Sequence, residues 1–218
     1  MPYRRTEHVT RKLAARHSAI LAAAGALAAE GGLANVQIAT VAERAGIAAG
    51  TVYRYFPAKI DLIAALVSAE AAAESAALEE AGNAAPGPLS ALAATIASFA
   101  ARALARRRIV FGLIAEPVDR ELDAVRSTYR QSLLRAFETR IRGALERGHL
   151  PDQDARAAAA ALMGALVEGL VGPLAPPETE DPAAIRARVQ TLTLFGLRGL
   201  GVIDARARGL VVQTALPR

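Results

Sequence analysis

The sequence predicts an all-α protein. Alanine, the strongest helix former, accounts for 53 of the 218 residues. Apolar residues recur at helical spacing in several long stretches, and no alternating stretch of useful length predicts a β-strand. The chain also has no cysteine, which excludes disulfides and thiolate metal sites and favours a cytoplasmic location.

The first helix is expected from about Thr10 to Glu30. Leu13, His17 and Ile20 lie on one face of it at helical spacing, and the pair Gly31-Gly32 ends it. A signal peptide is the alternative for this basic and apolar stretch, but the amphipathic spacing favours a helix. Two short helices are expected next, followed by a long one; their ranges are 38–45, 49–56 and 57–80.

The stretch Gly82 to Pro88 is the first clear break. The uncharged run that contains it, 81–101, is interrupted by proline and glycine and rich in alanine, serine and threonine, so we do not expect a membrane span there. We expect a loosely held tail from Asp204 onwards. The helices expected between the break and the tail are 89–105, 108–115, 119–147, 153–171 and 182–203.

The positive charge of the chain is concentrated near its N-terminus. The net charge is +5, and residues 1–60 carry eight basic and three acidic side chains. The remaining residues carry 18 of each sign. This asymmetry indicates a segment that binds a polyanion, attached to a neutral body.

The segment 36–55 has the anatomy of a helix-turn-helix. Gly46 is expected to end the first short helix in the left-handed conformation, and Ile47 to fill the turn. Val52 and Phe56 are expected to hold the second short helix on the core. The outward residues of that helix would then face DNA in the major groove. They are Ala49, Gly50, Thr51, Tyr53, Arg54 and Tyr55.

The pattern continues through Thr51-Val52-Tyr53-Arg54-Tyr55-Phe56-Pro57-Ala58-Lys59. This string resembles the signature of the tetracycline-repressor (TetR-type) family of bacterial transcriptional regulators, and the resemblance covers about residues 10–66. It implies about nine helices, with a three-helix DNA-binding domain over 1–57 and a ligand-binding and dimerisation domain over 58–218. It also implies that a homodimer binds a double-stranded, pseudo-palindromic operator and is released by a small-molecule effector.

By the same resemblance, Thr51, Tyr53 and Tyr55 match positions that contact DNA, and Lys59 matches a phosphate-binding lysine. Two alternatives stay open, because Tyr53 could pack against the first helix and Lys59 could be solvated. The sequence departs from the family at three helix N-caps, where Gln37, Ala48 and Ala58 replace the usual serine, threonine or asparagine. We therefore expect a DNA-binding domain of modest stability.

Between Arg156 and Glu178 the only charged residue is Glu168, so helix 153–171 is apolar on all sides over most of its length and must be covered on more than one side. A small-residue stripe and a bulky stripe run along it, and the last long helix has a similar uncharged section. We expect one side to pack on its own domain and the other on a second chain, although a buried hairpin in a monomer is the alternative. The expected dimer residues are Ala161, Leu162, Ala165, Leu166, Gly169, Leu192 and Phe195.

The effector pocket is expected among large side chains of the body, each of which could instead be plain core. Arg126 and Arg130 could face an anionic ligand, but a solvated helix face is the simpler interpretation, as it is for the triplet 106–108. Glu168 could pair across a dimer axis or with a ligand. The expected pocket residues are Phe99, Phe111, Ile114, Tyr129, Phe137, Met163 and Val167.

No motif in the chain predicts an enzyme, a metal site or a cofactor. It has no glycine-rich phosphate loop, no nucleophile elbow and no histidine at ligand spacing from a carboxylate. The alternative to a regulator is a helical protein that uses its basic first helix to bind anionic surfaces, either membrane or nucleic acid, without sequence preference. We expect DNA, a second copy and an effector as partners, and no membrane.

Overall fold

The computed structural model describes residues 3–117 and 120–215, and its fold confirms the all-α prediction. This part of the chain forms ten α-helices and one short 3₁₀ helix. The helices are α1 (Tyr3–Gly31), η1 (Leu33–Asn35), α2 (Ile38–Arg44), α3 (Ala49–Tyr55), α4 (Lys59–Asn83), α5 (Pro88–Ala105), α6 (Arg107–Ile114), α7 (Arg120–Leu145), α8 (Ala155–Leu170), α9 (Pro182–Gly199) and α10 (Asp204–Gln213).

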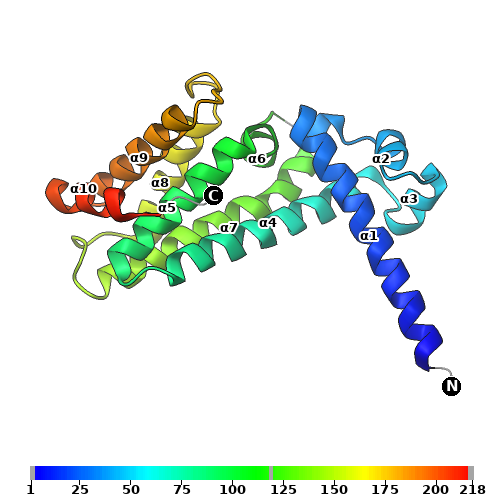
Figure 1. The fold of residues 1–218 in the computed structure, drawn as a ribbon, viewed down its shortest axis with the longest axis horizontal. Coiled ribbons are helices and arrows are strands. Elements are labelled where there is room, and N and C mark those ends of the chain that lie inside the picture. The colour runs from blue at the N-terminus through cyan, green and yellow to red at the C-terminus, as the bar shows by residue number, and fades with distance from the viewer. Residues whose placement is uncertain (1–2, 118–119, 216–218) are drawn as a thin grey trace.

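The molecule is elongated, with a small head at one end and a larger helical body at the other (Figure 1). The head consists of α2, α3 and the C-terminal half of α1, while the N-terminal half of α1 projects away from the other helices. α4 leaves the head and runs beside α7 along the body. One continuous helix therefore joins the two parts.

α5 is the central helix of the body. It packs against α4, α7 and α9, and most of its length is buried. Phe99 on α5 meets Phe137 on α7 edge to face, with 5.8 Å between ring centroids. α5 is also the one helix of the described residues that is long and apolar enough to cross a membrane, but here its apolar surface is covered by protein.

The expectation of a loosely held tail after residue 204 is wrong. Residues 204–213 form α10, which folds back onto α9 and α5 and buries Ala207 and Val211. Asp204 pairs with Arg198 on α9 and with Arg208 one turn further along α10. The sequence pattern missed this helix because only two of its apolar residues reach the core.

The expectation of a solvated face at Arg126 is also wrong. Arg126 is 3% exposed, and its guanidinium donates to the carbonyl oxygens of Gly112 and Glu116 at 2.9 and 2.7 Å. Its other amino group donates to Asp123, which also accepts from Arg130. Arg126 thus binds the C-terminal end of α6, where helix carbonyl groups lack partners within the helix.

The expectation of a solvated helix end at 106–108 holds for the exposed Arg108 but not for the half-buried Arg106 and Arg107. Arg106 forms a two-bond ion pair with Glu70 on α4, at 2.7 and 2.8 Å. Arg107 donates to the carbonyl oxygen of Pro176 in the α8–α9 loop, and Arg108 donates to the carbonyl oxygen of Glu30 at the end of α1. These three side chains connect the start of α6 to three other parts of the chain.

Candidate nucleic-acid interface

The turn between α2 and α3 has the geometry that the sequence predicts. Gly46 has φ +65°, and no atom lies within 4 Å of the position that a Cβ would take. The conformation, rather than crowding, therefore favours glycine here. The N–H of Ile47 donates to Ala42 and that of Gly46 donates to Glu43, both at 3.0 Å. These two bonds form the Schellman motif that ends α2.

α3 is held on the head by its inner face. Val52 is fully buried and Phe56, at the end of the helix, is 4% exposed, as expected. The opposite face is open, because Ala49, Gly50 and Arg54 are exposed and Thr51 is half-buried. A Cβ on Gly50 would meet no atom within 4 Å. α3 thus presents small side chains and one guanidinium to the outside of the molecule.

The two tyrosines of α3 have different surroundings. Tyr53 is 51% exposed, so the alternative in which it packs on α1 does not describe this structure. Tyr55 is half-buried instead, with its ring centroid 6.4 Å from that of His17 on α1. The Arg54 guanidinium lies 5.8 Å from the Tyr55 ring centroid. Tyr53 is therefore the freer of the two rings.

Lys59 is the first residue of α4 and is half-buried. It lies close to α3 in the chain, at the point where the head joins the body. Asp61, in the same turn, accepts the N–H of Ala58 at 2.9 Å, which satisfies one of the free donors at this helix start. The position suits a contact with a phosphate beside the groove that α3 would enter.

At the starts of α2, α3 and α4 the N-cap residue itself provides no side-chain cap, as expected from the sequence. Gln37, Ala48 and Ala58 all have the extended backbone of an N-cap residue, but none accepts a cap hydrogen bond through its side chain. The amide of Gln37 instead donates to the carbonyl oxygen of Ala34. The stability of the head therefore depends on its packing against α4 and α6.

The basic charge of the head is only partly available to a partner. Arg44 at the end of α2 forms a two-bond ion pair with Glu30 on α1, at 2.6 and 2.9 Å. This hydrogen bonding lowers the pKa of Glu30 and keeps it ionised. Exposed cations at this end of the molecule include Lys12 and Arg16 on the first half of α1 and Arg54 on α3.

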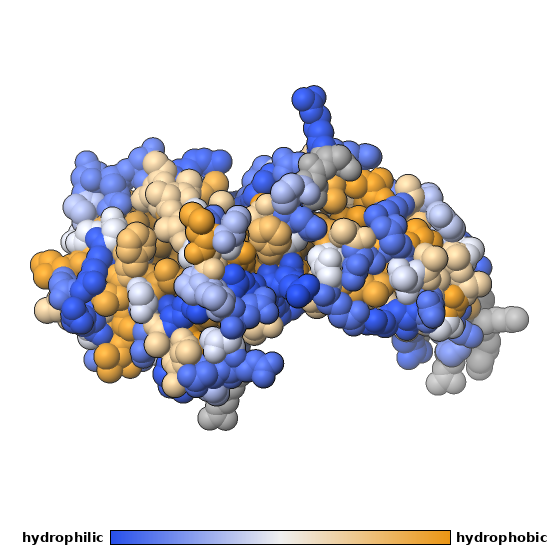
Figure 2. All heavy atoms as spheres, turned by 90° about the horizontal axis from the view of Figure 1, so that it is seen from above, coloured by the Kyte–Doolittle hydropathy of each residue, from blue (hydrophilic) through white to orange (hydrophobic). Residues whose placement is uncertain are grey.

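The expected dimer residues divide into two groups. Leu162 and Leu166 are buried inside the chain, and a Cβ on Gly169 would lie 2.9 Å from Leu192, so these positions bring α8 and α9 together. Ala161 and Phe195 are exposed, Phe195 at 56%. Ala165 is half-buried. Figure 2 shows apolar side chains on the surface at the end of the molecule where α8, α9 and α10 lie.

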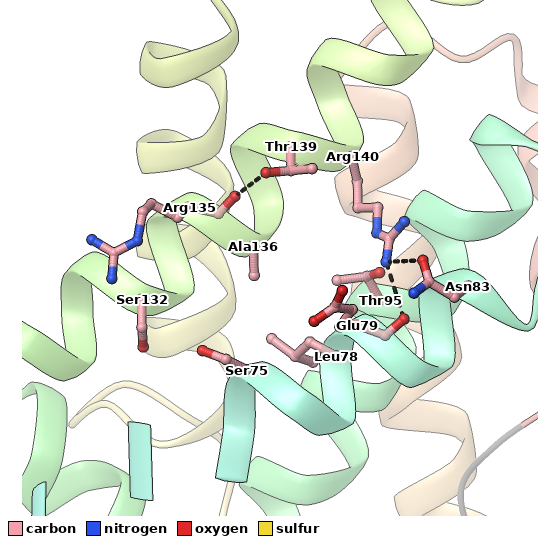
Figure 3. Close-up of a pocket in the computed structure, with 10 residues that line it drawn as sticks. All are labelled: Ser75, Leu78, Glu79, Asn83, Thr95, Ser132, Arg135, Ala136, Thr139 and Arg140. Atoms are coloured by element: carbon pink, nitrogen blue, oxygen red, sulfur yellow. Dashed lines mark hydrogen bonds between the residues drawn. The ribbon is translucent and has the colours of Figure 1, made fainter. Parts of the chain in front are cut away.

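Five of the seven expected pocket residues are buried in the packed core, and Phe111 and Met163 are half-buried. None of the seven lines the cavity of about 380 Å³ that opens between α4 and α7. Figure 3 shows this cavity, which polar side chains line for the most part. The sequence did not nominate it, because its residues lie on three helices and no local pattern joins them.

Glu168 accepts the N–H of Leu174 in the loop that follows α8.

An exposed second helix on a helix-turn-helix is the arrangement by which many DNA-binding proteins reach the major groove, and comparison with known proteins points to one family of them. Residues 20–66 match the family described as "Bacterial regulatory proteins, tetR family". This segment of the chain is therefore similar to the TetR family. The HTH-type transcriptional repressor KstR of Rhodococcus jostii (strain RHA1) is 49% identical over 55 residues, which are 25% of this chain and 26% of KstR. The KstR of Mycolicibacterium smegmatis is 47% identical over the same length. The match thus spans about a quarter of these curated relatives.

Solved structures share the fold over nearly the whole chain. The crystal structure of RolR in complex with resorcinol aligns with a TM-score of 0.66 and 24% identity, covering 96% of this chain and 98% of RolR. FadR from Bacillus subtilis, in complex with stearoyl-CoA, aligns with a TM-score of 0.71 and 19% identity, covering 84% and 98%. At these identities the likeness shows the fold. The chain therefore has the fold of these proteins, with a head segment that is similar to the TetR family.

Proposed function

We propose that this protein is a transcriptional repressor whose homodimer binds a pseudo-palindromic operator and is released by a small-molecule effector. The observation that carries the proposal is the open face of α3, which a glycine turn holds away from the core in a segment that matches the TetR family. An enzyme is not indicated. We place the head at 1–57 and the body at 58–218, because α4 begins at Lys59.

In this proposal α3 enters the major groove. Ala49 and Gly50 allow its N-terminal end to approach the base edges closely, while Thr51, Tyr53 and Tyr55 contact the backbone. Arg54 is the donor on α3 that suits a guanine edge. Lys59 binds a phosphate beside the groove. Few base contacts are then available, so the shape of the DNA supplies part of the specificity.

One head makes too few contacts for useful specificity, so we propose that α8 and α9 pair with the same helices of a second copy. The exposed side chains of Phe195 on α9 and Ala161 on α8 support this pairing, because an exposed aromatic ring favours a partner surface. Two heads about 34–36 Å apart would read successive major grooves on one face of the DNA.

An effector bound in the body would act by favouring one of two arrangements of the heads. The structure offers two routes for this coupling. α4 runs from the head into the body as one helix. α6 also contacts the head, since Glu116 accepts the N–H of Leu33 at 3.3 Å and Arg108 donates to Glu30. A shift of either helix in the body would therefore move the head.

Fluorescence anisotropy tests the proposal with the DNA upstream of the protein's own gene, a scrambled version of it and a series of salt concentrations. A regulator prefers its own DNA sequence. Its binding constant falls by about 0.9 log units per phosphate contact for each tenfold increase in salt concentration. Lys59→Ala should weaken binding to both DNAs alike, whereas Arg54→Ala should also reduce the preference between them.

Arg206→Ala is the matched control, because Arg206 is an exposed cation on α10, far from the head. It should leave both affinities unchanged. Equal binding to the two DNAs, together with binding to anionic vesicles, would instead support a helical protein that binds anionic surfaces without sequence preference.

A further inference from the structure

The cavity between α4 and α7 offers polar groups beside apolar surface. Eight of its ten lining residues carry a nitrogen or oxygen atom in the side chain. Its volume of about 380 Å³ lies in the range of small-molecule sites. The lining residues are Ser75, Leu78, Glu79, Asn83, Thr95, Ser132, Arg135, Ala136, Thr139 and Arg140.

A buried hydroxyl in the wall of this cavity has no partner. Thr95 on α5 is fully buried, and its Oγ1 makes no hydrogen bond to any of the described residues. Thr95 could have been an ordinary core residue if its hydroxyl bonded to its own helix, but it does not. A buried hydroxyl is costly when left unpaired. The Thr95 oxygen is covered in this arrangement, so an occupant of the cavity would pair with it once the Thr95 side chain turns toward the cavity.

The charged groups at the cavity balance each other. Figure 3 shows the Glu79 carboxylate pointing into the space between Thr95 and Ala136, while the Arg135 guanidinium points away from it. Arg140 lies on the other side of Thr95 and is fixed there, because its guanidinium donates to the carbonyl oxygen of Glu79 and to Asn83. An anion in the cavity would meet the carboxylate, and a cation would meet the guanidinium.

The remaining polar groups both donate and accept. The hydroxyl of Ser132 donates to the carbonyl oxygen of Tyr129 at 2.8 Å, which leaves its lone pairs free to accept. Ser75 adds a second hydroxyl from α4. Alcohol groups are the chemistry that suits such a wall, because each one donates to a carboxylate, accepts from a guanidinium and does both with another hydroxyl.

We propose that this cavity binds a neutral molecule with several hydroxyl groups, such as a polyol or a sugar. That such a molecule acts as the effector of the regulator rests on the proposed function. That it binds in the cavity does not. The ligand would lie between the C-terminal half of α4 and the middle of α7, the helix pair that forms the long contact of the body.

The proposal is tested by calorimetry with the full-length protein and matched probes. myo-Inositol and glucose are the neutral polyols, and cyclohexanol lacks most of the hydroxyls. Gluconate carries a negative charge, and glucosamine carries a positive charge. We expect myo-inositol or glucose to bind more tightly than each of the other three. Equal affinity for neutral and charged probes, or no binding of any polyol at millimolar concentration, would overturn the proposal.

Two variants separate binding from folding. Thr95→Val should weaken polyol binding about three- to tenfold, the effect of one neutral hydrogen bond, while raising the melting temperature of the ligand-free protein because an unpaired hydroxyl is removed. Glu79→Gln should reduce the difference in affinity between glucose and gluconate, because it removes the negative charge that gluconate would meet. Glu80→Gln, its neighbour on α4 outside the cavity, is the matched control and should change neither affinity.

Operator binding is measured on the same preparations. Polyol binding that leaves operator affinity unchanged would support the cavity and count against an effector role in the proposed function. If the protein binds the operator but binds none of the polyols, the result would support the proposed regulator and overturn the proposal that the cavity is a polyol site.

Discussion

Ala48→Ser should stabilise the protein by completing the N-cap of α3. Ala48 already has the backbone of a cap residue, with φ −70° and ψ 144°. Its carbonyl accepts the N–H of Thr51 at 2.8 Å, so the first turn is formed and only the side-chain oxygen is missing. A serine oxygen here would accept from the N–H of Gly50 or Thr51. Such a cap contributes about 1 kcal/mol, which corresponds to a rise in melting temperature of about 2–4 °C for a chain of this size.

The assay is urea unfolding followed by far-ultraviolet circular dichroism, with thermal melting as a second measurement. Ala69→Ser is the control, because Ala69 is exposed in the middle of α4, where serine is about 0.5 kcal/mol less favourable than alanine. The two serine variants should therefore change stability in opposite directions. If Ala48→Ser is no more stable than the wild type, the absence of caps does not limit the stability of the head.

Three further predictions concern the body. Burial raises the pKa of Glu74 despite the adjacent Arg102, so the folded state holds the carboxyl proton more tightly than the unfolded state does. As the pH rises above about 4.5, the free energy of unfolding of the wild type in urea should therefore fall relative to that of Glu74→Gln. Phe195→Glu should convert the proposed dimer to monomer in light scattering, whereas Leu13→Glu, at an exposed position on α1, should not. Arg126→Met should destabilise the protein by about 3 kcal/mol in urea, since it leaves buried carbonyl groups of α6 without a charged donor.

The features of the head that the sequence predicts are local ones. The left-handed Gly46, the buried Val52 and the uncapped helix starts each follow from a residue type at a fixed distance from its neighbours. Such patterns are decided within about two helical turns, so they do not depend on how distant helices pack. Once these inward positions are assigned, the other residues of α3 must form its outward face.

The features that the sequence misses are set by distant parts of the chain. Arg126 looks like a surface residue in a charged helix, and only the arrival of the end of α6 beside it explains its burial. The cavity depends in the same way on Thr95, Ser132 and Glu79, which come from three helices. The large side chains expected to line a pocket instead fill the core, because hydrophobic burial is the stronger force acting on them.

The position of the cavity along α4 has a mechanical consequence. α4 has 25 residues, so it is a rod of about 37 Å. Lys59 lies at its head end, while Ser75 and Glu79 line the cavity in its C-terminal half. A tilt of about 4° over such a length moves one end relative to the other by about 2.5 Å. In the proposed function, two heads that each shift by this amount would no longer match the spacing of successive major grooves, so an effector in the cavity would weaken operator binding.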